Sequence, residues 1–123
     1  MKRLLLVDDE EGLVDLLKEH FQKDYEIVTA VSGAAAVERF ATQRPDAVFL
    51  DINMPGVTGI DVLKLFRQTD DGVPVIMMTA NRDNKMAEEC LKNGAFAYVP
   101  KPFNLQYMDH MAALAVAQRR PPR

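Results

Sequence analysis

Five short apolar segments, each followed by a stretch with helical periodicity, constrain the fold of this chain more than any other feature. Each segment is too short for a helix and is apolar at successive positions, as in strands covered on both faces. The expected strands are Arg3–Val7, Tyr25–Ala30, Ala47–Leu50, Val73–Met78 and Phe96–Val99. Strands that alternate with helices over short connections predict an α/β fold, a doubly wound five-stranded parallel sheet with helices on both faces.

The intervening segments carry apolar side chains at helical spacing. We expect the first two helices to face the core with Leu13, Leu16, Leu17 and Phe21, and with Ala34, Val37, Phe40 and Ala41. Ser32 is the expected N-cap of the second helix, and Thr58 with Asp61 has the pattern of a capping box before the third. Asp83 or Asn84 is expected to cap the fourth helix. The pattern therefore predicts a helix after each strand.

Length and composition predict a single globular domain. The chain has 123 residues, of which 48% are hydrophobic, enough apolar surface for a core. We assign residues 1–118 to the domain and interpret residues 119–123 as a basic, Pro-rich tail or the start of a linker, because Pro121 cannot continue the last helix. The single cysteine, Cys90, excludes an intramolecular disulfide and any Cys-based zinc site.

The charge balance limits the classes of partner. The net charge is −3, and without the three arginines among the last five residues it is −6, from 12 basic and 18 acidic side chains. Because a domain with this much negative charge would repel phosphate backbones, we expect no direct nucleic-acid binding and favour proteins or cations as partners. No apolar segment approaches the ~20 residues needed to cross a bilayer, and no signal peptide is evident, so we expect a cytoplasmic protein.

Polar residues follow four of the five expected strands. They are Asp8, Asp9, Glu10 and Glu11 after the first strand, Asp51 and Asn53 after the third, Thr79 after the fourth and Lys101 after the fifth. Ligands of doubly wound sheets bind at this carboxyl edge. If the first and third strands are neighbours, three carboxylates face one another, which requires a cation between them or raised pKa values. A hard divalent ion such as Mg²⁺ suits such a site.

Each of these residues also has an ordinary structural explanation. An acid before a helix is usually a cap or a complement to the helix dipole, and an aspartate after a strand is often a loop residue. Thr79 alone would bond nearby backbone, Lys101 alone would be solvated, and Tyr98 alone would be a half-buried strand aromatic. Independent causes of this kind would not be expected to gather three acids, a hydroxyl and a lysine at one edge of one sheet.

The same residues belong to four motifs: V-D-D-E at 7–10, F-L-D-I-N-M-P-G at 49–56, M-T-A at 78–80 and Y-V-P-K-P-F at 98–103. In this order and spacing they resemble the receiver domain of two-component response regulators. The resemblance implies a flavodoxin-like sheet of strand order 2-1-3-4-5. It also implies a site in which Asp51 is the phosphoacceptor, Asp8, Asp9, Asp51 and the backbone carbonyl of Asn53 hold Mg²⁺ or Mn²⁺, Lys101 and Thr79 contact the phosphoryl group, and Thr79 and Tyr98 act as switch residues.

The resemblance further implies a function in signal transduction. A sensor histidine kinase or a histidine phosphotransfer protein would supply the phosphoryl group, and the surface of the fourth helix, fifth strand and fifth helix would then change. Such a domain catalyses only its own aspartyl phosphorylation and dephosphorylation and is not a separate enzyme. A downstream protein, an output domain or a second copy in a homodimer would read the change. Pro102 permits a cis Lys101–Pro102 bond that aims the lysine.

Two other functions fit the same alternation of strands and helices. A flavodoxin-like flavin-binding module needs a donor-rich loop after the first strand, and the acids that follow Val7 would repel its phosphate. A phosphohydrolase of the haloacid dehalogenase type carries an acid two residues after its aspartate, where this chain has Asn53. Both are therefore disfavoured. Whether the receiver acts alone or within a longer regulator stays open.

Overall fold

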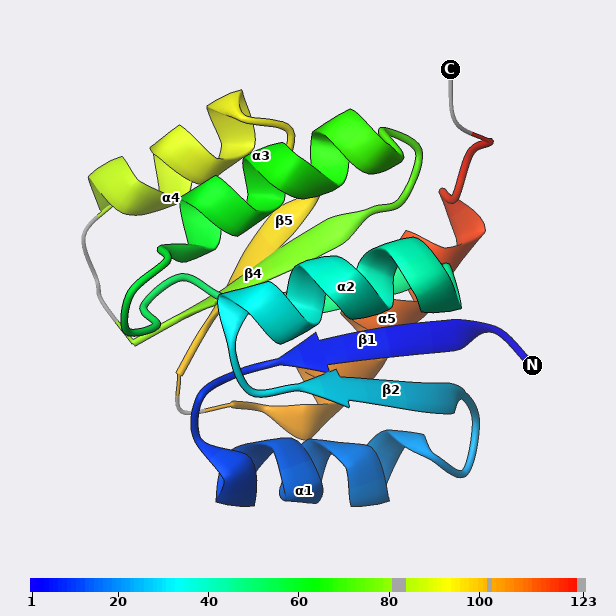
Figure 1. Ribbon diagram of the computed structural model, residues 1–123. Coiled ribbons are helices and arrows are strands. Elements are labelled where there is room, and N and C mark those ends of the chain that lie inside the picture. Colours follow the sequence, from blue (N-terminus) through cyan, green and yellow to red (C-terminus); the bar gives the residue numbers. More distant parts are fainter. Residues whose placement is uncertain (81–83, 102, 122–123) are drawn as a thin grey trace.

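The computed structural model describes residues 1–80, 84–101 and 103–121 and contains one five-stranded parallel sheet in the order β2-β1-β3-β4-β5 (Figure 1). The strands are β1 (Arg3–Val7), β2 (Glu26–Ala30), β3 (Ala47–Asp51), β4 (Val75–Thr79) and β5 (Ala97–Pro100). The helices are α1 (Glu11–Phe21), α2 (Gly33–Gln43), α3 (Gly59–Thr69), α4 (Asn84–Lys92) and α5 (Leu105–Ala117). The predicted α/β class, doubly wound sheet and strand order are confirmed.

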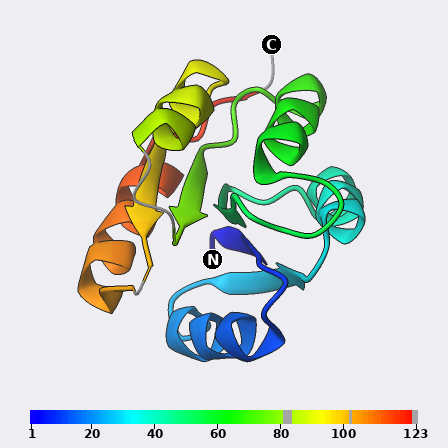
Figure 2. The same cartoon turned by 90° about the vertical axis from the view of Figure 1, so that its left-hand side faces the viewer.

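The sheet separates two apolar cores, because successive side chains of a strand point to opposite faces. Helices α2, α3 and α4 cover one face, and α1 and α5 cover the other (Figure 2). In β1, Leu5 and Val7 belong to the first core and Leu4 and Leu6 to the second. All four are fully buried, as expected for a strand covered on both sides.

Two predicted helix faces are rotated in the structure. In α1 the buried stripe is Val14, Leu17 and Phe21, so Leu16 lies on the outer side and is 53% exposed. In α2 the stripe is Gly33, Ala36 and Phe40, and Ala34 and Ala41 are exposed. Both helices present the narrow i, i+3, i+7 stripe that a flat sheet covers, so apolar residues flanking that stripe remain outside the core.

The predicted caps of two helices are confirmed. The Ser32 hydroxyl accepts a hydrogen bond from the Ala35 N–H at 3.1 Å, and the Thr58 hydroxyl accepts one from the Asp61 N–H at 3.3 Å. The expected cap of α4 at Asp83 or Asn84 and the expected cis bond before Pro102 lie outside what the structure describes. No helix in the described ranges has the length and apolar character needed to span a membrane.

Candidate functional site

The carboxyl ends of four strands bring the predicted site residues to one edge of the sheet. Asp51 is the last residue of β3 and Thr79 the last of β4, whereas Asp8 follows β1 and Lys101 follows β5. Strands β1 and β3 are neighbours, with Val7 paired to Leu50, so the residues after these two positions adjoin. The expected adjacency of the first and third strands is therefore correct.

Three carboxylates meet at this edge. One ligand oxygen from each of Asp8, Asp9 and Asp51 lies within 4.8 Å of the others. Asp8 is fully buried and Asp51 only 3% exposed, while Asp9 is open to solvent. The pKa of Asp51 is raised to about 6, first by burial and then by the negative charge of Asp8, with a smaller contribution from Asp9. This edge therefore resists a further negative charge and favours a cation.

Lys101 supplies the positive charge that this group of acids contacts directly. Its Nζ donates a hydrogen bond to Asp8 Oδ2 at 2.7 Å and lies 3.7 Å from Asp51 Oδ1. Burial lowers the pKa of Lys101, but the hydrogen bond to Asp8 and the charge of Asp51 outweigh it and raise the pKa above the ordinary value. The Lys101 N–H donates to the Thr79 carbonyl at 2.8 Å, which holds the residue beside the end of β4.

The loop after β3 folds closely around the Asp51 carboxylate. The Asn53 N–H donates to Asp51 Oδ1 at 3.2 Å, which lowers the pKa of Asp51 and brings the Asn53 backbone next to the acids. The Gly59 N–H donates to the Ile52 carbonyl at 2.8 Å, and a Cβ at position 59 would strike the Asp51 carbonyl oxygen and the Ile52 Cα. Glycine is therefore required where α3 begins against the end of β3.

Thr79 and Tyr98 lie on neighbouring strands and face the same side of the sheet. Tyr98 is paired with Met77, and Thr79 is two residues after Met77, so the pleat points all three toward the α4 side. Thr79 is 4% exposed, whereas Tyr98 is 39% exposed. The Thr79 side chain is therefore buried at the end of β4, whereas the Tyr98 side chain lies partly at the surface.

Two residues that the site prediction omitted, Glu10 and Phe103, lie near Lys101. Glu10 Oε1 is 4.0 Å from Lys101 Nζ, and the Phe103 ring centre is 6.0 Å from the same atom. The signal for Glu10 was present in the run of acids after β1. The signal for Phe103 was weaker, because an aromatic residue two positions after a lysine is common in any loop.

The donor set fits Mg²⁺, which prefers carboxylate and carbonyl oxygens and keeps several waters. Two of the three carboxylates are buried and one is exposed, and in the described part of the site one ammonium group contacts the two buried ones. A divalent cation would offset the charge that raises the pKa of Asp51. The acidic group is therefore compatible with magnesium.

Known proteins share both the sequence pattern and the fold. Residues 4–113 match the response regulator receiver domain family. The chain is 37% identical over 105 residues to sporulation initiation phosphotransferase F of Bacillus subtilis, covering 85% of each protein. It is 36% identical to the alkaline phosphatase synthesis transcriptional regulatory protein PhoP of Bacillus subtilis, of whose length it spans only 43%.

Solved structures agree with this match. The Vibrio cholerae chemotaxis protein CheY4 superposes with a TM-score of 0.88 at 27% identity, over 94% of this chain and 98% of that chain. Receiver domains of this family take phosphoryl groups from histidine kinases or phosphotransfer proteins, and they are not enzymes of the classical kind. The chain belongs to the receiver domain family of two-component response regulators.

Proposed function

We propose that Asp51 is the phosphoacceptor and that Asp8, Asp9, Asp51 and the Asn53 backbone carbonyl hold the Mg²⁺ or Mn²⁺ that its phosphorylation requires. The observation that carries the proposal is the surroundings of Asp51: a carboxylate 3% exposed, with a pKa raised to about 6, among two other acids and one lysine. A structural aspartate usually has a cation of its own, whereas Asp51 shares one lysine with Asp8 and lies beside two like charges.

The transfer itself needs a nucleophile and placed positive charge more than acid–base groups. An Asp51 oxygen attacks phosphorus, the P–N bond to the donor imidazole breaks, and the imidazole leaves with a proton from solvent. Lys101, 3.7 Å from Asp51 Oδ1, binds one phosphoryl oxygen, and the Thr79 hydroxyl binds another. When bound, Mg²⁺ supplies the remaining charge compensation.

The switch surface consists of α4, β5 and α5. A groove of about 750 Å³ runs there, and half-exposed apolar side chains line it, among them Leu91, Phe96, Tyr98 and Tyr107. A phosphoryl group that draws Thr79 inward would free space for the Tyr98 ring on the same side of the sheet. We propose that this rearrangement reshapes the groove.

The partners follow from these two surfaces. A sensor histidine kinase or histidine phosphotransfer protein in the cytoplasm would approach the carboxyl edge, where Asp51 lies. A downstream protein, an output domain or a second copy of this chain would bind the α4-β5-α5 groove after phosphorylation. The mainly apolar lining of the groove favours a protein partner over a nucleic acid.

Intact-mass spectrometry tests the assignment of Asp51. We expect the wild type to gain one phosphoryl group from acetyl phosphate in the presence of Mg²⁺ but not of EDTA, and Asp51→Asn to gain none. Asp15→Asn, which alters an exposed carboxylate on α1, is the matched control and should label like the wild type. Labelling of Asp51→Asn at the wild-type rate would refute the proposal.

A further inference from the structure

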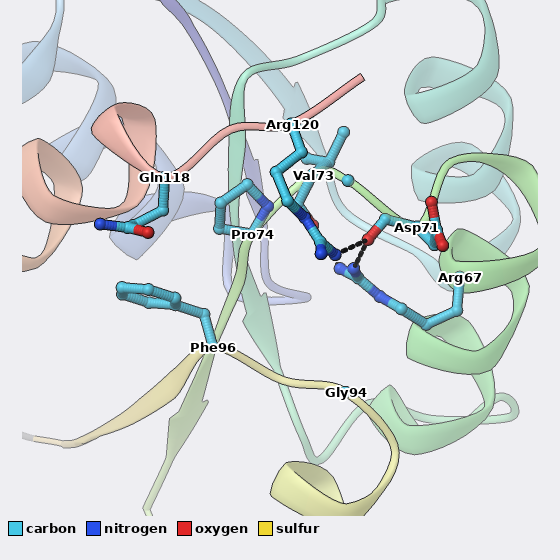
Figure 3. Close-up of a pocket in the computed structure, with 9 residues that line it drawn as sticks. Arg67, Asp71, Val73, Pro74, Gly94, Phe96, Gln118 and Arg120 are labelled. Atoms are coloured by element: carbon cyan, nitrogen blue, oxygen red, sulfur yellow. Dashed lines mark hydrogen bonds between the residues drawn. The ribbon is translucent and has the colours of Figure 1, made fainter. Parts of the chain in front are cut away.

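A second group of charged residues lies at the opposite, amino-terminal edge of the sheet, and phosphorylation of Asp51 makes no use of it. After α5, residues 118–121 turn across this edge and pack on the turn between α3 and β4 (Figure 3). The Arg120 N–H donates to the Gly72 carbonyl at 3.0 Å. The segment expected to be a tail or linker is therefore in contact with the domain through its own backbone.

Arg119 joins this segment to two distant parts of the chain. Its Nη2 donates to Asp70 Oδ2 at 3.1 Å, and its Nε lies 3.9 Å from Asp46 Oδ1. The Arg119 side chain is only 21% exposed, and its two carboxylate partners are similarly covered. A half-buried arginine shared by two acids is positioned more specifically than a solvated surface ion pair.

Gly72 shows that the segment shapes the turn. A Cβ at this position would strike the carbonyl group of Arg120, whose carbon would lie at 2.8 Å, and would be 3.0 Å from Pro121 O. The φ of Gly72 is not in the left-handed region, which among the described glycines is adopted by Gly56 and Gly94. Glycine is thus required at position 72 by the approach of the C-terminal segment and not by the backbone of the turn itself.

Arg120 completes the contact beside Arg67. Both guanidinium groups donate to the Asp71 carbonyl oxygen, at 3.2 Å from Arg120 and 2.9 Å from Arg67 (Figure 3). Burial and the neighbouring Arg120 lower the pKa of Arg67, while Asp71 and Asp70 raise it, and burial is the largest effect. Arg67 Nε is buried without a hydrogen-bond partner. The ion pairs of Arg119 therefore favour the docked segment, whereas the proximity of Arg67 to Arg120 and the unsatisfied Arg67 Nε oppose it.

We propose that residues 118–121 form a reversible arginine strap that fastens the end of α5 to the turn between α3 and β4. The docking surface consists of Asp46, Asp70 and the carbonyls of Asp71 and Gly72, and its occupant is this chain's own segment. Because ion pairs hold the strap, high ionic strength opens it. The folded unit then extends through Pro121, and the strap controls the freedom of the C-terminal end of α5.

Trypsin measures the opening of the strap in the full chain. The bond between Arg119 and Arg120 is a trypsin site, whereas Pro121 protects the next bond. We expect Gly72→Ala and Asp70→Asn to speed cleavage after Arg119 about tenfold, because the first adds a Cβ that strikes the Arg120 carbonyl and the second removes the charge of one ion pair of the closed strap. Asp70→Asn keeps an oxygen to accept the Gly72 N–H, whose hydrogen bond to Asp70 Oδ1 is 2.9 Å long. About 1 M NaCl should speed wild-type cleavage in the same direction.

The matched controls are Gly12→Ala, where a Cβ meets nothing within 4 Å, and Asp15→Asn, an exposed acid of the same helix. We expect both variants to be cleaved at the wild-type rate and to keep the hydrogen-exchange rate that the Arg120 N–H has in the wild type. Equal cleavage in Asp70→Asn and Asp15→Asn would overturn the strap, as would wild-type cleavage as fast as in the free peptide of residues 114–123. If Gly72→Ala unfolds the domain, Asp70→Asn decides the question alone. Neither measurement depends on the phosphorylation of Asp51.

Discussion

The two edges of the sheet both gather charged side chains from distant parts of the chain, but they balance charge differently. At the carboxyl edge three carboxylates converge, and one lysine contacts two of them, Asp8 and Asp51. At the amino edge Arg119 lies between Asp46 and Asp70, and carbonyl oxygens accept from Arg67 and Arg120. The first edge holds unmatched negative charge, and the second is nearly neutral.

The difference shows how a functional cluster can be told from a structural one. Crowded like charge costs stability, and carboxylates crowded in this way are common where another charge arrives during function. Side chains of opposite charge that pair with each other need no additional ion, and they join different elements of the fold. The raised pKa of Asp51 reports the first situation, and the shared arginine at position 119 reports the second.

Two glycines allow the edges to be compared directly, and they give the largest expected effect. At Gly59 a Cβ would strike the backbone at the end of β3, whereas at Gly72 it would strike the C-terminal segment, which can lift away. We expect Gly59→Ala to lower the free energy of unfolding by about 3 kcal/mol or more and Gly72→Ala by about 1 kcal/mol. Urea denaturation measures both, and equal losses would contradict the expectation that the C-terminal segment can lift away from Gly72 whereas the backbone beside Gly59 cannot.

Removing the charge of Asp51 should stabilise the protein. Its pKa is raised from 3.8 to about 6, so the benefit of the protonated carboxyl is fully present below about pH 3.8 and is lost as the pH rises through about 6. At pH 7.5 without divalent ions, Asp51→Asn should therefore be more stable than the wild type by roughly 1–3 kcal/mol. Thermal denaturation from pH 4 to 8 measures the difference in stability between Asp51→Asn and the wild type. A difference that shrinks with rising pH would contradict a raised pKa of Asp51.

Magnesium should distinguish the two acids that follow β1. Asp8 is buried and already accepts from Lys101 Nζ at 2.7 Å and from the Glu10 N–H at 3.0 Å, whereas Asp9 is exposed. We expect Asp9→Ala to weaken Mg²⁺ affinity about tenfold more than Asp8→Ala, because Asp9 is free to act as a direct ligand. Calorimetric titration measures both affinities, and comparable losses would remove this distinction.

Salt should act on the two edges with opposite sign, and this is the smallest effect. Raising NaCl from about 0.05 to about 0.5 M screens the repulsion among the acids and weakens the ion pairs of Arg119. Each contribution is expected to be about 0.5 kcal/mol. Asp51→Asn should lose the stabilising effect of added salt at the carboxyl edge, and Arg119→Gln should lose the destabilising effect of added salt at the amino edge. Urea midpoints at both salt concentrations measure these effects. The same salt response in both variants would contradict this assignment.

Local sequence signals determined most of the fold. The first strand was predicted with its observed bounds, Arg3–Val7, because a run of apolar residues on both faces has few other solutions. Ser32 and Thr58 cap their helices as predicted, since a cap depends on residues only three positions apart. The site prediction followed from the same logic, because parallel strands place their carboxyl ends at one edge.

Only the tertiary structure decided what long-range packing controls. Leu16 is as apolar as Leu17, yet it remains 53% exposed because the helix can turn only one stripe toward the sheet. The raised pKa of Asp51 requires its burial and the approach of Asp8, more than forty positions earlier in the chain. Likewise, the sequence predicts a tail or linker at residues 119–121, whereas the structure packs these residues on the domain. Their partners Asp46, Asp70 and Gly72 are distant in sequence and are brought to them only by the completed sheet. Local patterns encode local hydrogen bonds and burial, whereas the balance of charge at an edge depends on which distant segments the fold brings together.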